Sequence, residues 1–388
     1  MSCIKAIVAS IVVCFIWVYG LAQEGTWNWA ESGGGINIED PATIAVDSNG
    51  NSYITGSYQD TGIFGSYSLT NRGQQDVFVA KIDANGNYLW AAKAGGTYYD
   101  VGNDITIDSS GNVYITGVFN SPTIYFGNNN SMTLTRTGSS NDVFVAKLNS
   151  SGTWIWAKKA GGNYSDGGQS IALDSNNNIL ITGVFQGAQY FGSLPPFVGY
   201  GYSDIFVAKM DNNGNFLWAS KAGGSNSENA KGIVVSSDNS IYICGSFAST
   251  TVTFGSLTVT NSATNNTMDA FVAKLDPDGN WIWVRKGDGA SSESAYAITR
   301  DSNDFLYIAG TKQQNLAIGG TILESYGEFD VFVAKIDPSG NWIWAQRAGG
   351  TNYDIAWGIA VDSWSNLFVT GEFKATAVFG PYSVSASP

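Results

Sequence analysis

A segment with the pattern D-x-F-V-A-K recurs along the chain, and this repetition constrains the fold more than any other feature. It begins at Asp76, Asp142, Asp204, Asp269 and Asp330, so the spacings are 66, 62, 65 and 61 residues. A second pattern, I-x-V-D followed by Y-I-T-G, alternates with it and starts at Ile44, Ile105, Ile171, Ile233, Ile298 and Ile359. The sequence therefore predicts one supersecondary unit of about 64 residues that stacks on copies of itself.

Each repeat is predicted to hold four β-strands bounded by clusters of Asn, Asp and Gly. The first strand is I-x-V-D, the second V-Y-I-T-G-x-F, the third D-x-F-V-A-K-x-D and the fourth G-N-x-x-W-x-x-K. Both faces of the third strand are apolar, as at Phe78, Val77 and Val79, which is typical of a sheet covered on both sides. Four-stranded antiparallel sheets packed between like sheets predict an all-β fold of the β-propeller type.

The order of the strands predicts six blades, with seven as the alternative. GTWNWAESGG matches a fourth strand alone; five complete repeats follow it, and then the first two strands of a sixth. Residues 23–388 are thus expected to form one propeller domain. Its last blade either takes a substitute third strand from residues 375–387 or lacks that strand because the chain is cut short.

The alternation of I-A-V-D-x-x-G-N-x-Y-I-T-G with D-x-F-V-A-K-x-D-x-x-G-N-x-x-W resembles the bacterial β-propeller repeats called SBBP repeats. The resemblance extends over nearly all of the chain after its first residues. It implies a propeller in a secreted or surface protein, often attached to other modules. It implies no activity, because that repeat family has no general catalytic residues to carry over.

The N-terminal residues 1–22 are predicted to be a secretory signal peptide. Lys5 supplies the positive charge, residues 6–19 the apolar run, and Gly20-Leu21-Ala22 the small residues near a cleavage point. A membrane anchor is the alternative, although the apolar run is short for a spanning helix. The expected location is therefore extracellular or at the cell surface.

Composition excludes several functional classes. The chain has no histidine, which removes Ser-His-Asp and Cys-His nucleophile systems and His-based zinc or haem sites. Its net charge of −13 argues against nucleic acid or an anionic membrane surface as a partner. Cys244 is the one cysteine after the signal peptide and replaces a Thr of the sister repeats, so it is expected to be a strand residue without redox function.

Two short connections per repeat, such as DSNGN at Asp47 and DANGN at Asp83, are predicted to be tight hairpin turns. We call them the short turns. Calcium binding is the alternative, above all at DPDGN from Asp276, although an EF-hand-like site needs a longer loop and a distal carboxylate. No cofactor is expected, and Ca²⁺ is the only candidate.

The other two connections are longer and more variable, and both are expected at the opposite end of the blade. The second–third link joins the second strand to the third, and the crossing link joins the fourth strand to the next repeat. The second–third link at residues 120–141 is expected to contain an extra hairpin. Variable loops on a rigid scaffold are where binding usually resides. In every crossing link a carboxylate stands five residues before the Ile of the first strand: Glu39, Asp100, Asp166, Glu228, Glu293 and Asp354.

These six carboxylates have two interpretations. They either accept backbone N–H groups and hold the crossing between blades, or form a ring that binds a cation or a basic ligand. Tyr99, Tyr164 and Tyr353 precede three of them and are candidate ligand contacts.

Two other repeated side chains have structural interpretations. The W-x-W tryptophans of the fourth strands are expected to pack between blades, whereas Trp357 falls outside that register and is a candidate contact. The lysine of F-V-A-K is expected to pair with Asp76 and its equivalents, or with a carboxylate of the neighbouring blade.

The function expected is a non-catalytic interaction or scaffold module, a monomer that binds a protein or a carbohydrate on the faces of these links. The alternative is a propeller enzyme. A carboxylate-based glycosidase or lyase would use acidic residues such as Glu324 and Glu328. A quinoprotein-like dehydrogenase is suggested faintly by G-N-x-x-W, but the vicinal cysteines and histidines common there are absent.

Overall fold

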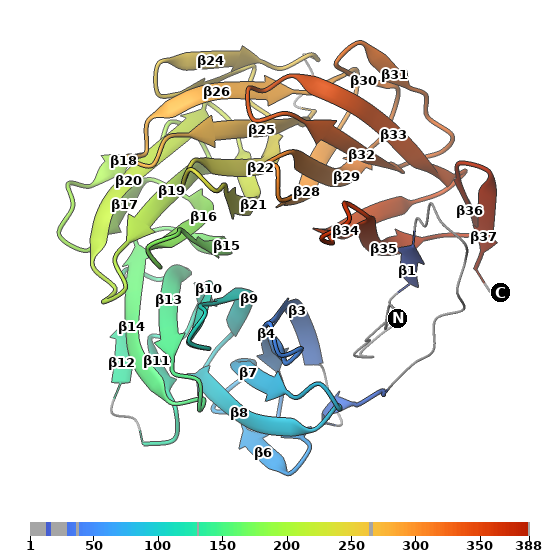
Figure 1. Ribbon diagram of the computed structural model, residues 1–388. Coiled ribbons are helices and arrows are strands. Elements are labelled where there is room, and N and C mark those ends of the chain that lie inside the picture. Colours follow the sequence, from blue (N-terminus) through green and yellow to red (C-terminus); the bar gives the residue numbers. More distant parts are fainter. Residues whose placement is uncertain (1–12, 17–28, 36–38, 130–131, 264–266, 387–388) are drawn as a thin grey trace. The chain divides into compact units, whose positions relative to one another are not determined.

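The computed structural model describes residues 13–16, 29–35, 39–129, 132–263 and 267–386 (Figure 1). The regular elements of these residues are β-strands, and the paired strands run antiparallel. None of the described residues belongs to a helix long and apolar enough to cross a membrane. The predicted signal peptide lies outside the described residues except for β1 (Val13–Ile16).

The predicted strands form in every repeat. The first strands are β3 (Glu39–Val46), β9 (Asp100–Ile107), β15 (Gly167–Leu173), β21 (Glu228–Val235), β28 (Glu293–Arg300) and β34 (Asp354–Val361). The second strands are β4 (Ser52–Tyr58), β10 (Val113–Phe119), β16 (Ile179–Phe185), β22 (Ile241–Phe247), β29 (Leu306–Lys312) and β35 (Leu367–Phe373). The third strands are β7 (Asp76–Ile82), β13 (Asp142–Leu148), β19 (Asp204–Met210), β25 (Asp269–Leu275) and β32 (Asp330–Ile336). The fourth strands are β8 (Tyr88–Gly95), β14 (Trp154–Gly161), β20 (Phe216–Gly224), β26 (Trp281–Lys286) and β33 (Trp342–Gly350).

The expectation of four-stranded sheets is wrong in one respect, because the second–third links form hairpins that extend the sheets. The hairpins are β5 (Thr61–Phe64) with β6 (Tyr67–Thr70), β11 (Thr123–Phe126) with β12 (Met132–Thr135), β17 (Ala188–Phe191) with β18 (Phe197–Val198), β23 (Thr251–Phe254) with β24 (Leu257–Thr260), β30 (Leu316–Ile318) with β31 (Thr321–Leu323), and β36 (Thr376–Phe379) with β37 (Tyr382–Ser385). Four of the six hairpins pair with the end of the preceding repeat's fourth strand, as β11 does with β8 at Ala94 and Gly95. The sheet β12-β11-β8-β7-β4-β3 therefore has six strands.

Two short elements take the same pairing role. β2 (Gly33–Gly34), in the segment predicted to be a lone fourth strand, pairs with β5. β27 (Asp288–Gly289), in the crossing link after β26, pairs with β30.

The last repeat decides against one of the two alternatives for its third strand. The described part of residues 375–387 does not supply a substitute strand, because β36 pairs with β33 through Gly349 and Gly350. The position beside β35 is taken by β1, and the sheet has the order β1-β35-β34.

The described chain falls into two compact units. Unit 1 contains Ala22–Gly199 and Val207–Ala219, and unit 2 contains Val12–Leu21, Tyr200–Phe206 and Ser220–Pro388. Within each unit the first strands of successive repeats lie against one another, as β3 does against β9 and β28 against β34. The second and third strands form the core: all seven residues of β4 and all seven of β22 are buried.

The tryptophans of the fourth strands join successive repeats, which confirms the packing interpretation. Trp90 is only 9% exposed, and its Nε1 donates a hydrogen bond to Ser150 O (3.0 Å) in a short turn of the next repeat. The same bond recurs from Trp29 to Ala84 O, from Trp156 to Asn212 O and from Trp283 to Pro338 O. An apolar ring and a polar N–H are thus used together at one boundary.

Candidate functional site

The short turns have the predicted turn chemistry. Asp276 Oδ1 accepts the backbone N–H groups of Asp278 and Asn280, and its Oδ2 accepts Asn280 Nδ2. Both oxygens are therefore occupied by the turn itself. The described residues contain no cluster of three or more metal-ligating side chains with the geometry of a metal site.

The F-V-A-K lysines do not pair as expected with Asp76 and its equivalents. Lys81 Nζ lies 4.9 Å from the ring centroid of Tyr53 on the neighbouring second strand, and four of the five repeats place this lysine so. Lys209 forms an ion pair of 3.0 Å with the turn residue Asp174. The reason is position: the lysine stands near the short-turn end of the third strand, whereas Asp76 begins that strand at the link end.

The carboxylates of the crossing links are enclosed by their own links. Asp100, Asp166, Glu228, Glu293 and Asp354 are at most 1% exposed. Four of them accept the N–H of the residue four positions earlier, at 2.7 Å in each case. Direct ligand contact by these groups stays a prediction, and their burial argues against it. The side chain of Glu39 is not among those that the structure describes.

Sequence reasoning missed the partner of each crossing carboxylate, the Asp that begins the third strand. These aspartates are Asp76, Asp142, Asp204, Asp269 and Asp330, all 0% exposed. In each, Oδ2 accepts a backbone N–H from the second–third link, such as that of Arg72 at 2.9 Å. Within the described part of the chain, Oδ1 has no hydrogen-bond partner in any of the five.

Two buried carboxyl groups therefore face each other at each crossing. Burial raises the pKa of Asp76 to about 7, and the neighbouring charge of Asp100 adds to the rise. Burial likewise raises the pKa of Asp100 to about 6 and that of Asp166 to about 7. Like charges at short range in a low-dielectric site cannot both be retained, so the protonated form of one member is favoured. The sequence signal that could have revealed this pair is the aspartate that begins every D-x-F-V-A-K segment.

Repeat 5, from β28 to β33, departs from this pattern at Glu293. Among the described residues, neither of its carboxyl oxygens has a hydrogen-bond partner. Burial raises its pKa to about 8, and the charge of Asp269 adds to the rise. Glu293 is thus a carboxyl group with a raised pKa, enclosed at the crossing.

The same repeat carries a buried lysine where sister second strands end in Phe119, Phe185, Phe247 and Phe373. Lys312 and Asp330 are both 0% exposed and form an ion pair of 3.1 Å. Lys312 Nζ also donates to the carbonyls of Glu324 (2.9 Å) and Gln314 (3.3 Å). One ammonium thus holds both arms of the second–third link.

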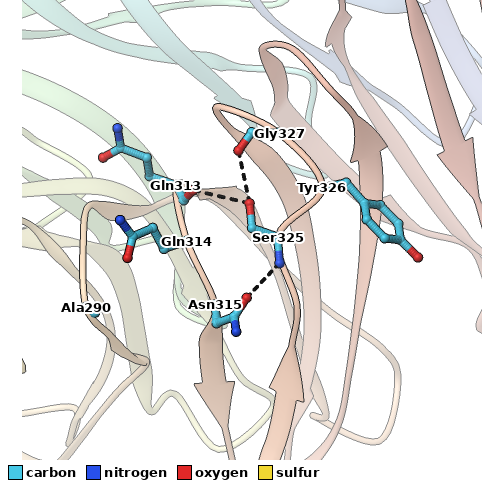
Figure 2. Close-up of a pocket in the computed structure, with 7 residues that line it drawn as sticks. All are labelled: Ala290, Gln313, Gln314, Asn315, Ser325, Tyr326 and Gly327. Atoms are coloured by element: carbon cyan, nitrogen blue, oxygen red, sulfur yellow. Dashed lines mark hydrogen bonds between the residues drawn. The ribbon is translucent and has the colours of Figure 1, made fainter.

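These two arms border a polar cavity of about 580 Å³. Figure 2 shows Ser325 joining them: its Oγ lies within hydrogen-bond distance of the carbonyls of Gln313 (3.3 Å) and Gly327 (3.0 Å), and its N–H donates to Asn315 Oδ1. Gln314 and Tyr326 point to different sides in this view. The side chains that line the cavity carry no charge.

The tyrosines expected to contact a ligand are exposed at the link ends of their repeats. Tyr99 is 53%, Tyr164 60% and Tyr353 39% exposed. Tyr353 stacks on Phe329 with ring centroids 5.1 Å apart. The exposure of these three side chains is compatible with ligand contact, which stays a prediction.

Trp357 belongs to a feature that sequence reasoning did not identify. Every first strand has a β-bulge two residues before its Ile, where the pairing skips one residue: Ala42, Asn103, Gln169, Lys231, Tyr296 and Trp357. We call these the bulge residues. All six differ, although the Ile two positions later never varies. Aligning the six copies would have revealed this variable position.

The comparisons with known proteins agree with the repeat pattern. Residues 32–57 and 89–121 match the family model described as SBBP, beta-propeller repeat. The chain is also similar to an uncharacterized WD repeat-containing protein of Acanthamoeba polyphaga mimivirus, with 25% identity over 92% of this chain. The chain spans only 32% of that relative's length.

Two solved structures are similar at low identity. The WD40 domain of Neurospora crassa Pan2 has 12% identity and a TM-score of 0.38, covering 89% of this chain and 90% of that one. The extracellular domain of BT4673, a putative one-component system of B. thetaiotaomicron, has 11% identity and a TM-score of 0.34, covering 88% of this chain and 39% of that one.

Proposed function

We propose that the chain is a non-catalytic interaction or scaffold module, secreted or displayed at the cell surface as a monomer. The observation that carries the proposal is the division between repeated and variable residues. The repeated residues, such as Trp90, Asp76 and the short-turn aspartates, pack between strands or bond to the backbone of links and turns. Exposure and variation coincide at the link ends and at the bulge residues, where Tyr164 and Trp357 lie. Rigid supports with variable surfaces are typical of binding modules.

The architecture proposed for this module is a propeller of six blades. The strand count supports it, since β2 supplies the end of a fourth strand to the hairpin of the first repeat and β34 and β35 begin a sixth. The net charge of −13 supports a partner other than nucleic acid or an anionic membrane.

A secretion experiment tests the first part of the proposal. The full chain is expressed with its own N-terminus in a bacterial host that recognises signal peptides, and the culture medium is examined. The expected product in the medium is a chain that begins just after Ala22, identified by N-terminal sequencing. A chain retained in the cells with Met1 intact would contradict the proposal.

A binding experiment tests the second part. Purified chain is immobilised and offered extracellular proteins and polysaccharides, and retained species are quantified. Tyr99→Ala, Tyr164→Ala and Tyr353→Ala are expected to weaken retention, whereas Trp364→Ala, in a short turn and 78% exposed, leaves it unchanged. Absence of any ligand, or equal retention by all variants, would overturn the assignment of binding to the link ends.

An enzyme is the second candidate because Glu293 has the raised pKa of a general acid. Hydrolysis of any polysaccharide in the same panel, lost in Glu293→Gln, would replace the scaffold proposal. No hydrolysis with ligand retention supports the binding module.

A further inference from the structure

The bulge residues combine two independent signs of a ligand-contacting role. A β-bulge leaves one residue unpaired and re-aims its side chain, and bulges recur next to functional sites. Here the bulge falls at the same place in all six first strands, so the backbone feature is a constant part of the repeat. The side chain it carries is different in each copy. A packing role would favour one residue type, as it does at the tryptophans of the fourth strands.

The bulges of successive first strands are neighbours in space. In unit 1, Asn103 Nδ2 donates to the carbonyl of Gly168 (2.7 Å), the residue directly before the bulge residue Gln169. In unit 2, the rings of Tyr296 and Trp357 lie against each other with centroids 4.8 Å apart and planes at 50°. Bulge residues of adjacent repeats therefore form a row within each unit.

The row of unit 2 consists of Lys231, Tyr296 and Trp357, on β21, β28 and β34. Trp357 is 51% exposed although it lies in the middle of a strand. Within the described residues its ring contacts the ring of Tyr296. Lys231 is half-buried near Cys244, and burial lowers the pKa of its ammonium. An exposed indole therefore shares a row with a phenol and with a half-buried amine.

This chemistry matches a pyranose ring better than other ligands. The face of an exposed indole attracts the apolar C–H face of a sugar by dispersion. The ammonium, the phenol and the indole N–H are hydrogen-bond donors around that face, and sugar hydroxyls accept from them. A flat aromatic ligand cannot be sandwiched between the two rings, because at 4.8 Å they already touch. A nucleic acid is disfavoured by the chain's net charge of −13.

We propose that Lys231, Tyr296 and Trp357 form a carbohydrate-binding site on the first strands of unit 2, which takes a neutral sugar with its ring stacked on Trp357. The inference rests on the proposed binding function and names its ligand class. It adds the bulge residues as a sugar-binding surface to the link ends, where Tyr99, Tyr164 and Tyr353 lie.

The test is affinity gel electrophoresis of the full chain in gels that contain single neutral polysaccharides, including a β-glucan, a mannan, a xylan and a galactan. At least one polysaccharide is expected to retard the wild type. Trp357→Ala is expected to weaken that affinity at least about tenfold, as removal of a central aromatic contact does. Lys231→Met is expected to weaken it about three- to tenfold, while Lys231→Arg, which keeps the donors, retains most of it.

Trp364→Ala is the matched control, because Trp364 is 78% exposed and belongs to the short turn that follows β34. Circular dichroism and thermal melting establish that each variant is folded. A second measurement avoids substitution: N-bromosuccinimide oxidises exposed tryptophans, and the bound polysaccharide is expected to protect Trp357 but not Trp364, as read by mass spectrometry.

The outcomes separate this inference from the function on which it rests. Equal retardation of Trp357→Ala and Trp364→Ala, or equal oxidation of both tryptophans, would overturn the bulge site and leave a carbohydrate-binding module with its site elsewhere. Retention of proteins but of no neutral polysaccharide would overturn the ligand class and leave the binding function standing. Absence of any ligand would overturn both.

Discussion

Lys312 shows how a single residue can change the role of a repeated position. Sister repeats place Phe119, Phe185 or Phe247 there, each fully buried. A charged group in that place is tolerated because Asp330 supplies the counter-charge and two carbonyls take the remaining N–H groups. Burial lowers the pKa of Lys312, and the charge of Asp330 opposes that shift. A buried pair of this kind contributes little to net stability. Removal of one partner is nevertheless strongly destabilising, because the other charge is then buried without a partner.

Lys312→Met is therefore expected to destabilise the chain by about 3 to 5 kcal/mol, because the buried Asp330 loses its partner. The second substitution Asp330→Asn in the same chain is expected to restore most of the loss, since no uncompensated charge is left. Urea denaturation of the two single variants and the double variant measures the coupling. Additive effects of the two substitutions would show that the pair does not act as a unit.

At the scale of elements, the short turns show how local backbone conformation limits the residue types at one position. Gly50 and Gly111 have φ of 79° and 76° three residues after the turn aspartate. In sister turns the same position is Asn177 or Asn239, with φ of 59° and 64°. Asn tolerates the left-handed region better than most residues with a side chain, because its amide bonds locally. Comparison of the repeats thus shows that this turn position accepts both Gly and Asn.

Gly111→Ala is expected to cost about 1 kcal/mol, because a Cβ is disfavoured at positive φ. Gly111→Asn is expected to cost a few tenths of that, as the natural turns indicate. The measurement is the free energy of unfolding in urea for both variants. Identical losses would mean that space, not φ, limits this position, where the nearest atom to a new Cβ is Ser150 Cβ at 3.3 Å.

The boundary between repeats gives a second prediction at this scale. Trp90→Phe retains an aromatic ring but removes the hydrogen bond to Ser150 O, so a loss of about 1 kcal/mol is expected. Trp90→Ala also leaves a cavity and is expected to cost about 3 to 5 kcal/mol. Trp364→Phe, at an exposed site, is the control. Equal stability of Trp90→Phe and the control would show that this hydrogen bond does not stabilise the boundary between repeats.

The strands that are easiest to predict are those buried on both faces, because burial selects apolar side chains at successive positions. The second and third strands of the first five repeats have this pattern, as β4, β7 and β22 show. The first and fourth strands and the Asp-Asn-Gly turns were predictable from their repeated motifs. The hairpins of the second–third links escaped prediction, except for a hairpin expected in residues 120–141, because their pairing partner is the glycine end of another repeat's fourth strand. Gly95 and Gly350 carry no side chain that could signal this contact. Side-chain alternation predicts burial, and backbone pairing between distant segments leaves no comparable pattern.

The candidate site was predictable to a different extent. The carboxylates of the crossing links stood out by position, and their backbone partners followed from that position. Their pairing with the third-strand aspartates did not, because two like charges are not expected to share a buried site unless one is protonated. Trp357 was singled out as irregular, but its relation to Lys231 and Tyr296 depends on a bulge, which only the register of the strands reveals.

At the scale of the whole molecule, two sets of carboxyl groups give stability opposite dependences on pH. The short-turn aspartates, such as Asp47, Asp83 and Asp108, have pKa values lowered below 3.8 by their turns, with burial opposing the shift. Their stabilisation is present above pH 4 and is lost as the pH falls below it. The buried pairs act the other way, since burial raises the pKa of Asp100 to about 6 and that of Asp166 to about 7.

Groups with a raised pKa stabilise the fold fully below their unfolded pKa, and this contribution is lost as the pH rises through the folded pKa. The free energy of unfolding is therefore expected to be highest near pH 4 and to fall by at least about 1 kcal/mol as the pH rises to 8. Urea denaturation at constant ionic strength measures the profile. Glu293→Gln, which keeps a neutral side chain where the pKa is raised from 4.5 to about 8, is expected to flatten the profile between those two pH values. A wild-type profile that is level or rises from pH 5 to 8 would mean that the paired carboxyl groups are ionised without cost, and the crossings would then need a bound cation.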